Sequence, residues 1–238
     1  LVKIDGGNKR NAIAREAKAV IAAESDTLDI INERYEAYAQ DVAEEYGAIE
    51  KEIKVGFAEY SGNADAAIDE MTAWNLVAAL CASPHGVLAM SQEIENFVET
   101  STNLASIRKQ EGKIVVTTSQ RSSVASGREN MSSVVRACLE LGGAQCETGE
   151  GYPGWKMNPK SEILRIATES YRALYNKEPK ILAIHAGLEC GLFSEKYPQL
   201  DMISVGPTLR GVHSPEERLH IPSVKIVWDH LLDILKRA

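Results

Sequence analysis

The sequence has few cysteines, and none of them form short-range pairs. Four occur among the 238 residues, at Cys81, Cys138, Cys146 and Cys190. Because there is no C-x-x-C pair, the spacing favours neither a structural zinc site nor a disulfide framework. We therefore expect reduced thiols that serve packing, as in a cytoplasmic protein.

Long apolar runs and clusters of basic residues are also missing. No run approaches the roughly 20 apolar residues that a membrane-spanning helix needs, and no export signal is recognisable after Leu1. The 34 acidic residues outnumber the 26 basic ones, which gives a formal net charge of -8. We therefore expect neither a membrane nor a nucleic acid as a partner.

Strand-like and helix-like patterns alternate before residue 150. An apolar content of 44% supports one large or two modest domains. Apolar residues at spacings of three and four predict helices over 25–46, 64–81 and 130–141. Strands are predicted over 12–23, 53–60, 94–107, 113–120 and 144–149, with Gln110-Glu-Gly as a hairpin turn. This order favours an antiparallel sheet with helices on one face.

The composition changes at Gly149-Glu-Gly-Tyr-Pro-Gly-Trp, and we place a domain boundary near Gly151. The segment that follows predicts an α/β arrangement with helices over 161–175, 187–196 and 223–237 and strands over 180–185 and 201–205. Two strands bury little surface, so we expect them to pair with strands outside this chain. The strand-like start at Leu1 likewise favours a piece of a larger protein.

His213 is the first candidate site residue. It lies in Gly211-Val-His-Ser-Pro-Glu-Glu-Arg, after the apolar run 202–205 and the turn Gly206-Pro207. Open α/β sheets place ligands beyond the ends of their strands, and histidine is a common metal ligand, although it is also common in surface turns. A catalytic metal needs about three protein ligands, so His213 would be only part of a site.

A second group of candidates lies in Ile184-His-Ala-Gly-Leu-Glu-Cys-Gly-Leu. His185 and Glu189 are four residues apart and would face one another on a helix, or they are a strand-end histidine and a helix-start acid. Gly187 and Gly191 indicate close backbone approach, either to a ligand or between a strand and a helix.

Asn11 and Arg121 are the remaining candidates. An amide and a guanidinium group can polarise a carbonyl oxygen or hold a carboxylate, but both residue types are also routine on surfaces. His220 and His230 fall at or within the last predicted helix, where we expect solvated side chains.

Several of these segments together resemble the aminoacyl-histidine dipeptidases, or peptidase D, a family of di-zinc exopeptidases. The two most specific are Ile181-Leu-Ala-Ile-His-Ala-Gly-Leu-Glu-Cys-Gly-Leu-Phe and, after Ser204-Val-Gly-Pro, the His213 motif. The family's lid region is matched by Gly6-Gly-Asn-Lys-Arg-Asn-Ala-Ile, Val98-Glu-Thr-Ser-Thr-Asn-Leu and Ser119-Gln-Arg-Ser-Ser.

The resemblance implies a lid and dimerisation domain over residues 1–152, its N-terminal part missing, and the C-terminal part of a catalytic domain over residues 153–238. It implies that His213 is a zinc ligand, that Asn11 and Arg121 contact the substrate from the lid, and that Gly187 offers a backbone contact. It assigns no role to Glu189. Ala14 stands where the family usually has proline, which would loosen the turn beside Asn11.

The family's other metal ligands and its general base would precede this lid, so no catalytic residue is expected here. The resemblance therefore implies a fragment, inactive alone, of a homodimeric zinc enzyme that cleaves Xaa-His dipeptides. Two alternatives stay open: a non-catalytic dimerisation or scaffold module, and a related aminoacylase or carboxypeptidase.

Overall fold

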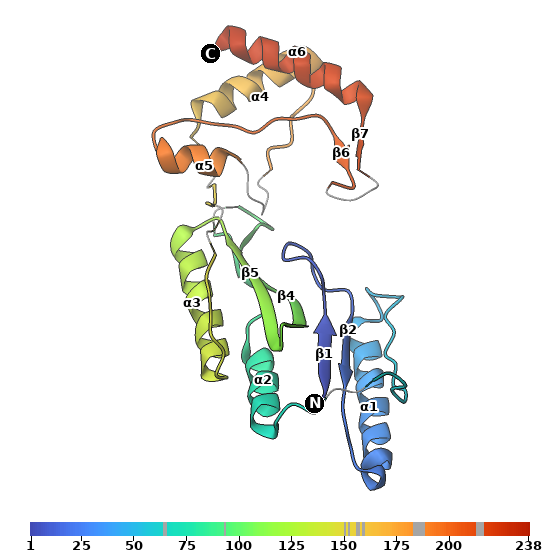
Figure 1. The fold of residues 1–238 in the computed structure, drawn as a ribbon. Coiled ribbons are helices and arrows are strands. Elements are labelled where there is room, and N and C mark those ends of the chain that lie inside the picture. Colours follow the sequence, from blue (N-terminus) through green and yellow to red (C-terminus); the bar gives the residue numbers. More distant parts are fainter. Residues whose placement is uncertain are drawn as a thin grey trace. The chain divides into compact units, whose positions relative to one another are not determined.

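The chain divides into two compact units, and neither is a continuous stretch. The computed structural model describes residues 1–63, 66–92, 94–149, 151, 153–155, 158, 160–182, 189–212 and 217–238. The first unit comprises residues 1–84, 103–119 and 136–146, and the second comprises 85–102, 120–135 and 147–238. Figure 1 shows the chain as a ribbon. The boundary near Gly151 stays a prediction.

A five-stranded sheet organises the part of the chain before residue 150. Its strands are β1 (Lys3–Gly6), β2 (Ala17–Val20), β3 (Gly86–Met90), β4 (Val98–Gln110) and β5 (Lys113–Ser122). The order is β2-β1-β4-β3, and β5 also pairs with β4. The pairs β1–β2, β1–β4 and β3–β4 are antiparallel. The mixed α/β class with an antiparallel sheet is therefore confirmed.

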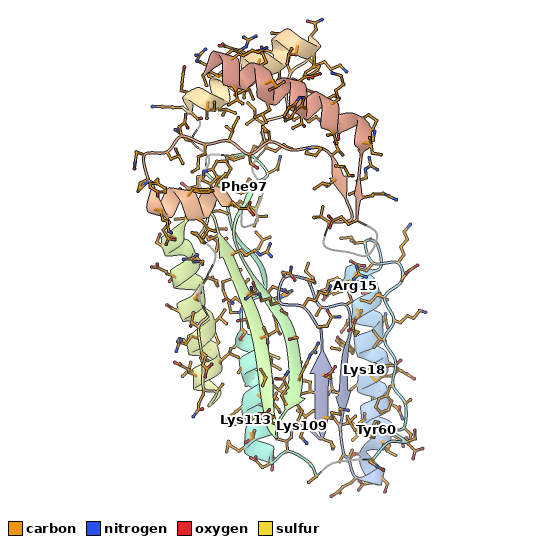
Figure 2. The ribbon with its side chains drawn as sticks, turned by 45° about the horizontal axis from the view of Figure 1, so that its top comes forward. Arg15, Lys18, Tyr60, Phe97, Lys109 and Lys113 are labelled. Carbon is orange, nitrogen blue, oxygen red and sulfur yellow. The ribbon has the colours of Figure 1, made fainter. Side chains whose placement is uncertain are left out.

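The turn between β4 and β5 is the predicted hairpin. Glu111 and Gly112 both have positive φ, at 48° and 78°, as a two-residue turn that matches the twist of its strands requires. Lys109 and Lys113 lie on either side of this turn in Figure 2, and both are exposed. These lysines keep the end of the hairpin solvated.

Three long helices accompany the sheet: α1 (Leu28–Tyr46), α2 (Glu70–Ala82) and α3 (Ala125–Leu141). A short 3-10 turn, η1 (Ser25–Thr27), precedes α1. Helix α2 begins later than predicted because the Asp69 side chain accepts the backbone N–H of Thr72 at 2.9 Å and caps it there. The buried apolar residues of this region are Val2, Val42, Ala79, Ala105, Ile107, Met131, Val135 and Leu139.

The strand predicted over 53–60 is wrong, because this segment packs on α1 instead of pairing. The Tyr35 hydroxyl donates to the Val55 carbonyl at 3.1 Å, and the rings of Tyr35 and Phe57 lie 5.4 Å apart. The predicted strand over 12–23 shortens to β2, and residues 144–149 form no strand. Two segments with alternating apolar residues therefore have different partners: residues 53–60 contact helix α1, and β2 pairs with strand β1.

The C-terminal region is mostly helical. It contains α4 (Glu162–Tyr175), α5 (Glu189–Lys196) and α6 (Ile221–Arg237), with a two-stranded antiparallel ribbon of β6 (Leu209–Arg210) and β7 (Arg218–Leu219). A small core of Ile166, Ala167 and Ile234 joins α4 to α6, with Ile163 and Ile203 packed against it. The strand predicted over 201–205 is absent, as is its counterpart over 180–182, while 183–185 lie outside the described residues.

His230 corrects a prediction, because it is buried between α4 and α6 and not solvated. Its exposed fraction is 9%, and its Nε2 lies 2.8 Å from the Ala167 carbonyl oxygen. The ring meets Tyr171 edge-on at 5.3 Å. Since a carbonyl only accepts, Nε2 carries the proton, and this hydrogen bond fixes the two helices against each other.

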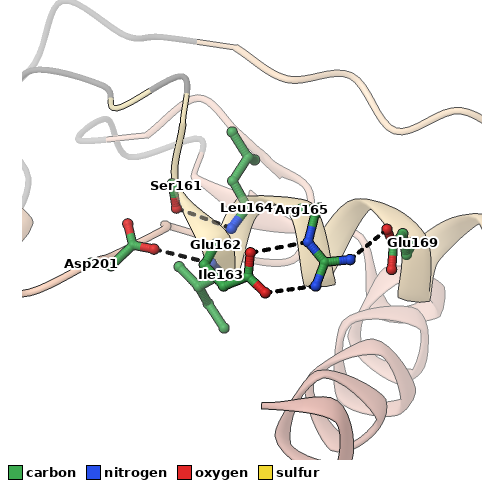
Figure 3. Close-up of polar contacts among 7 residues, drawn as sticks. All are labelled: Ser161, Glu162, Ile163, Leu164, Arg165, Glu169 and Asp201. Atoms are coloured by element: carbon green, nitrogen blue, oxygen red, sulfur yellow. Dashed lines mark hydrogen bonds and ion pairs between the residues drawn. The ribbon is translucent and has the colours of Figure 1, made fainter.

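The start of α4 is fixed by two acceptors, shown in Figure 3. The Ser161 hydroxyl oxygen accepts the Leu164 N–H at 3.1 Å, and Asp201 accepts the Ile163 N–H at 3.1 Å. A hydrogen bond from the Ser161 hydroxyl, and then those from backbone N–H groups, hold the pKa of the Asp201 carboxyl below its usual value. Asp201 thus ties the segment that was predicted as a strand to the start of α4.

Gly7 follows β1 directly, in a conformation that only glycine adopts without strain. Its φ is +61°, and a Cβ at this position would collide with the carbonyl oxygen of Ala105 in β4. The backbones of the two strands approach each other here because no side chain separates them.

Replacing Gly7 with alanine should therefore destabilise the chain by about 2 kcal/mol or more, from the left-handed φ and the collision together. The matched control is Gly112→Ala, which has a positive φ but open space around the added methyl, and should cost only about 1 kcal/mol. Urea unfolding of both variants measures the difference. Equal losses would show that the contact with Ala105 contributes nothing.

The lowered pKa of Asp201 makes a prediction about pH. A carboxyl with a depressed folded-state pKa adds stability above its unfolded-state pKa, about 3.9, and this contribution disappears as the pH falls through the folded-state value. Asp201→Asn should therefore lower Tm at pH 7, and the difference from the unmodified chain should shrink towards pH 3. Asp41→Asn, on an exposed position of α1, is the control. A difference that persists at low pH would contradict a charge effect.

Candidate functional site

Asn11 lies at the tip of the loop that joins β1 to β2. The Gly7 N–H donates to the Glu16 carbonyl at 3.0 Å and closes the base of this loop. The Ala12 N–H donates to the Lys9 carbonyl at 3.2 Å, which makes a tight turn with Asn11 at its third position. Asn11 is exposed, so its amide is available to a ligand from solvent.

The side chain of Asn103 in β4 binds the backbone of the same turn, a role that our sequence reasoning missed. Its Nδ2 donates to the Ala12 carbonyl at 2.8 Å and to the Arg10 carbonyl at 3.4 Å. Farther along β4, an Arg108 nitrogen donates to the Gly7 carbonyl at 2.6 Å. The only sequence signal was that Asn103 sits in the Val98–Leu104 motif.

Arg121 is the last residue but one of β5, and it is half-buried. Its neighbours Gln120 and Ser122 bond to β4 on one face of the sheet: Gln120 Nε2 donates to Thr102 at 3.1 Å, and the Ser122 and Thr100 hydroxyls lie 2.9 Å apart. Since side chains alternate along a strand, Arg121 projects from the opposite face.

Asn11 belongs to the first compact unit and Arg121 to the second. Each is therefore placed within its own unit, and their meeting at one substrate stays a prediction.

His213, His185 and Gly187 lie outside the described residues. The two strands on either side of the His213 segment pair in register, Leu209 with Leu219 and Arg210 with Arg218. The base of this ribbon is joined to the start of α6 by Ser223, whose hydroxyl donates to the His220 carbonyl at 2.6 Å and accepts the Thr208 N–H at 2.9 Å. Ser223 is a second structural residue that the sequence did not single out.

Glu189 is the first residue of α5 and is exposed. Next to it, burial raises the pKa of the Cys190 thiol, so this group stays protonated near neutral pH. A thiol that is not ionised is a poor nucleophile. Neither residue acquires a catalytic assignment from its surroundings.

Gly191 resolves one of the open alternatives in favour of packing. A Cβ at Gly191 would collide with the carbonyl oxygen of Pro153. In the same way, a Cβ at Gly154 would collide with the carbonyl oxygen of Ser122 at the end of β5. Three backbone segments thus lie in direct contact, and the close approach at Gly191 is to protein backbone.

The described residues do not form a metal centre by themselves. Among them, no group of three or more His, Cys, Asp or Glu side chains could hold a metal ion. Since a catalytic zinc takes three protein ligands, they do not fit a zinc site without further donors. In the same described part of the chain, none of the helices is both long and apolar enough to span a bilayer.

Comparison with known proteins identifies close relatives, although no protein-family model matches the sequence. The cytosol non-specific dipeptidase of Escherichia coli K12 is 36% identical over 236 residues, which are 99% of this chain and 48% of that protein. The crystal structure of aminoacylhistidine dipeptidase from Vibrio alginolyticus matches all of this chain with a TM-score of 0.88 and 40% identity.

That structure, too, is covered only in part, over 48% of its chain. This chain therefore spans about half the length of the relatives that it matches. Both relatives are named dipeptidases, and the match in fold is as extensive as the match in sequence. The resemblance predicted from the sequence motifs is confirmed: over its whole length, this chain is similar to about half of each of these two dipeptidases.

Proposed function

We propose that this chain is part of a zinc-dependent aminoacyl-histidine dipeptidase that hydrolyses Xaa-His dipeptides such as β-alanyl-histidine. The observation that carries the proposal is the match of the whole chain, in sequence and fold, to half of an aminoacylhistidine dipeptidase. Residues 1–152 would form the lid and residues 153–238 the C-terminal part of the catalytic domain.

In this proposal, Asn11 and Arg121 divide the recognition of the substrate between them. One stabilises the oxyanion that forms at the scissile carbonyl, and the other anchors the terminal carboxylate of the dipeptide. Support comes from the exposed position of Asn11 at a turn tip, which leaves its amide accessible, and from the guanidinium group of Arg121, a natural partner for a carboxylate.

The proposal further assigns His213 as one ligand of a zinc ion and Gly187 as a backbone contact to the substrate. Bound zinc would supply an activated water and polarise the substrate carbonyl. The remaining ligands and the general base would come from the rest of the enzyme. His185 and Glu189 receive no role.

The exposed apolar side chains of α6 support a larger protein around this chain. Trp228 and Leu235 are 59% and 66% exposed, and at seven residues apart they lie on one face of the helix. An exposed apolar patch of this kind marks an interaction surface. We propose a cytoplasmic homodimer joined through the lid, in keeping with the cytosolic name of the E. coli relative.

A second candidate is a non-catalytic dimerisation or scaffold module. It is favoured by the lack of a three-ligand group among the described residues. The two candidates differ in whether a complete protein containing this chain is an enzyme, and a panel of dipeptides and acylated amino acids would also reveal an aminoacylase or carboxypeptidase.

The 238-residue chain alone, supplied with zinc, should not hydrolyse β-alanyl-histidine, because one ligand cannot hold a catalytic metal. A complete enzyme of about the relatives' length that contains this chain should hydrolyse it in the same assay. His213→Ala is the matched variant. Zinc-dependent turnover by the isolated chain that disappears in His213→Ala would contradict the proposal, and so would an inactive complete protein.

In that complete enzyme, Asn11→Ala and Arg121→Ala should each lower kcat/KM by about a hundredfold, since each removes a group that contacts the transition state or the substrate. Zinc content, measured by atomic emission, should stay unchanged. Lys9→Ala, at an exposed position of the same turn, is the control. Loss of zinc from the Asn11 or Arg121 variant would place that residue in the metal site instead.

A further inference from the structure

We propose that Asn103 is a positioning residue for Asn11: its amide fixes the turn 9–12 so that the Asn11 side chain is held ready for the substrate. This inference rests on the proposed function of Asn11. It is carried by the two carbonyl groups that the Asn103 amide binds, which belong to Arg10 and Ala12, the residues immediately before and after Asn11.

The orientation of the Asn103 amide follows from its neighbours. Its Nδ2 faces two carbonyl oxygens, at 2.8 and 3.4 Å. Carbonyl oxygens only accept hydrogen bonds, so the opposite orientation would place oxygen against oxygen. Both N–H groups of the amide therefore point at the turn.

The two contacts restrain the backbone on both sides of Asn11. A peptide unit is planar, so the bond to the Arg10 carbonyl fixes the unit that enters Asn11. The unit that leaves Asn11 carries the Ala12 N–H, which donates to the Lys9 carbonyl at 3.2 Å, and the bond from Asn103 to the Ala12 carbonyl fixes the unit after it. The direction in which the Asn11 side chain leaves the backbone is then set by β4, a strand that lies more than 90 residues away in sequence. Arg108 adds a second tether from β4 at the start of the loop, on the Gly7 carbonyl.

The oxygen of the Asn103 amide indicates that this residue does not serve packing alone. Its Oδ1 is buried and has no hydrogen-bond partner among the described residues. A buried acceptor without a partner is unfavourable, and a leucine of similar shape would fill the space without that penalty. The N–H groups, and therefore the turn that they hold, account for an asparagine at this position.

The test uses a complete enzyme that contains this chain, with Asn103→Leu, which keeps the volume and removes the donors, and Asn103→Ala as a second variant. Hydrogen exchange of the peptide covering residues 7–16 should become faster in both. Tyr35→Phe is the matched control, because it removes one side-chain hydrogen bond to a carbonyl, that of Val55, in another loop of the same unit. It should leave exchange over 7–16 unchanged.

Activity supplies the second measurement. Asn103→Leu should lower kcat/KM by about tenfold or more, as misplacement of a substrate contact does, and the constant that changes, kcat or KM, should be the one that changes in Asn11→Ala. In the Asn11→Ala background, Asn103→Leu should alter kcat/KM by less than about twofold, because the residue through which it acts is already gone.

Each outcome decides the inference. Unchanged exchange over residues 7–16, or effects of Asn103→Leu and Asn11→Ala that multiply, would show that Asn103 does not act through this turn. A loosened loop with normal kcat/KM in both Asn103→Leu and Asn11→Ala would overturn the role of Asn11 itself, and with it the proposed function of this loop. A loosened loop with a non-additive loss of activity supports the proposal.

Discussion

The hydrogen-bonding capacity of β4 is the constraint on which the rest of the sheet depends. A strand has two edges, and β4 pairs with three strands. Because β5 follows it along one edge through the hairpin, β1 and β3 must share the other, β3 along residues 98–102 and β1 at Ile107. The buried positions of β4 change at the same place, from Thr100 and Thr102 to Ala105 and Ile107. Asn103 lies where one edge partner gives way to the other, which is why its side chain can reach the β1–β2 loop.

Sequence patterns predicted elements whose stability comes from local interactions. Helices α1, α4 and α6 and the β4–β5 hairpin were found because amphipathic spacing, the Ser161 cap and the Glu111-Gly112 turn act over short distances along the chain. The segments 53–60 and 201–205 were mistaken for strands. Alternation of apolar and polar residues indicates that one side of a segment is buried, but it does not show which part of the chain buries it. In the first segment, the Val55 carbonyl accepts a hydrogen bond from the side chain of Tyr35. In the second, the Asp201 side chain accepts a hydrogen bond from the start of α4.

The candidate site residues, in contrast, stay predictions. Asn11 and Arg121 stand in motifs whose match to known dipeptidases extends along the chain, and the structure places one on an exposed turn and the other near a strand end. Asn103 and Ser223 could not be singled out in this way. Each acts by joining segments that are distant in sequence, and a polar residue that serves as a tether looks like any other polar residue until the chain is folded. His230 was missed for the same reason, since burial of an imidazole depends on a helix 63 residues away.

The backbone contacts at Gly154 and Gly191 have a mechanical consequence. Side chains usually separate neighbouring segments, and their rotamers absorb small displacements. The main chains of three segments are in direct contact, with no side chain between them: the end of β5, residues 153–154 and α5. Close-packed atoms compress little and transmit strain. A shift of α5 towards residues 153–154 would therefore press directly on the main chain beside the strand end that bears Arg121.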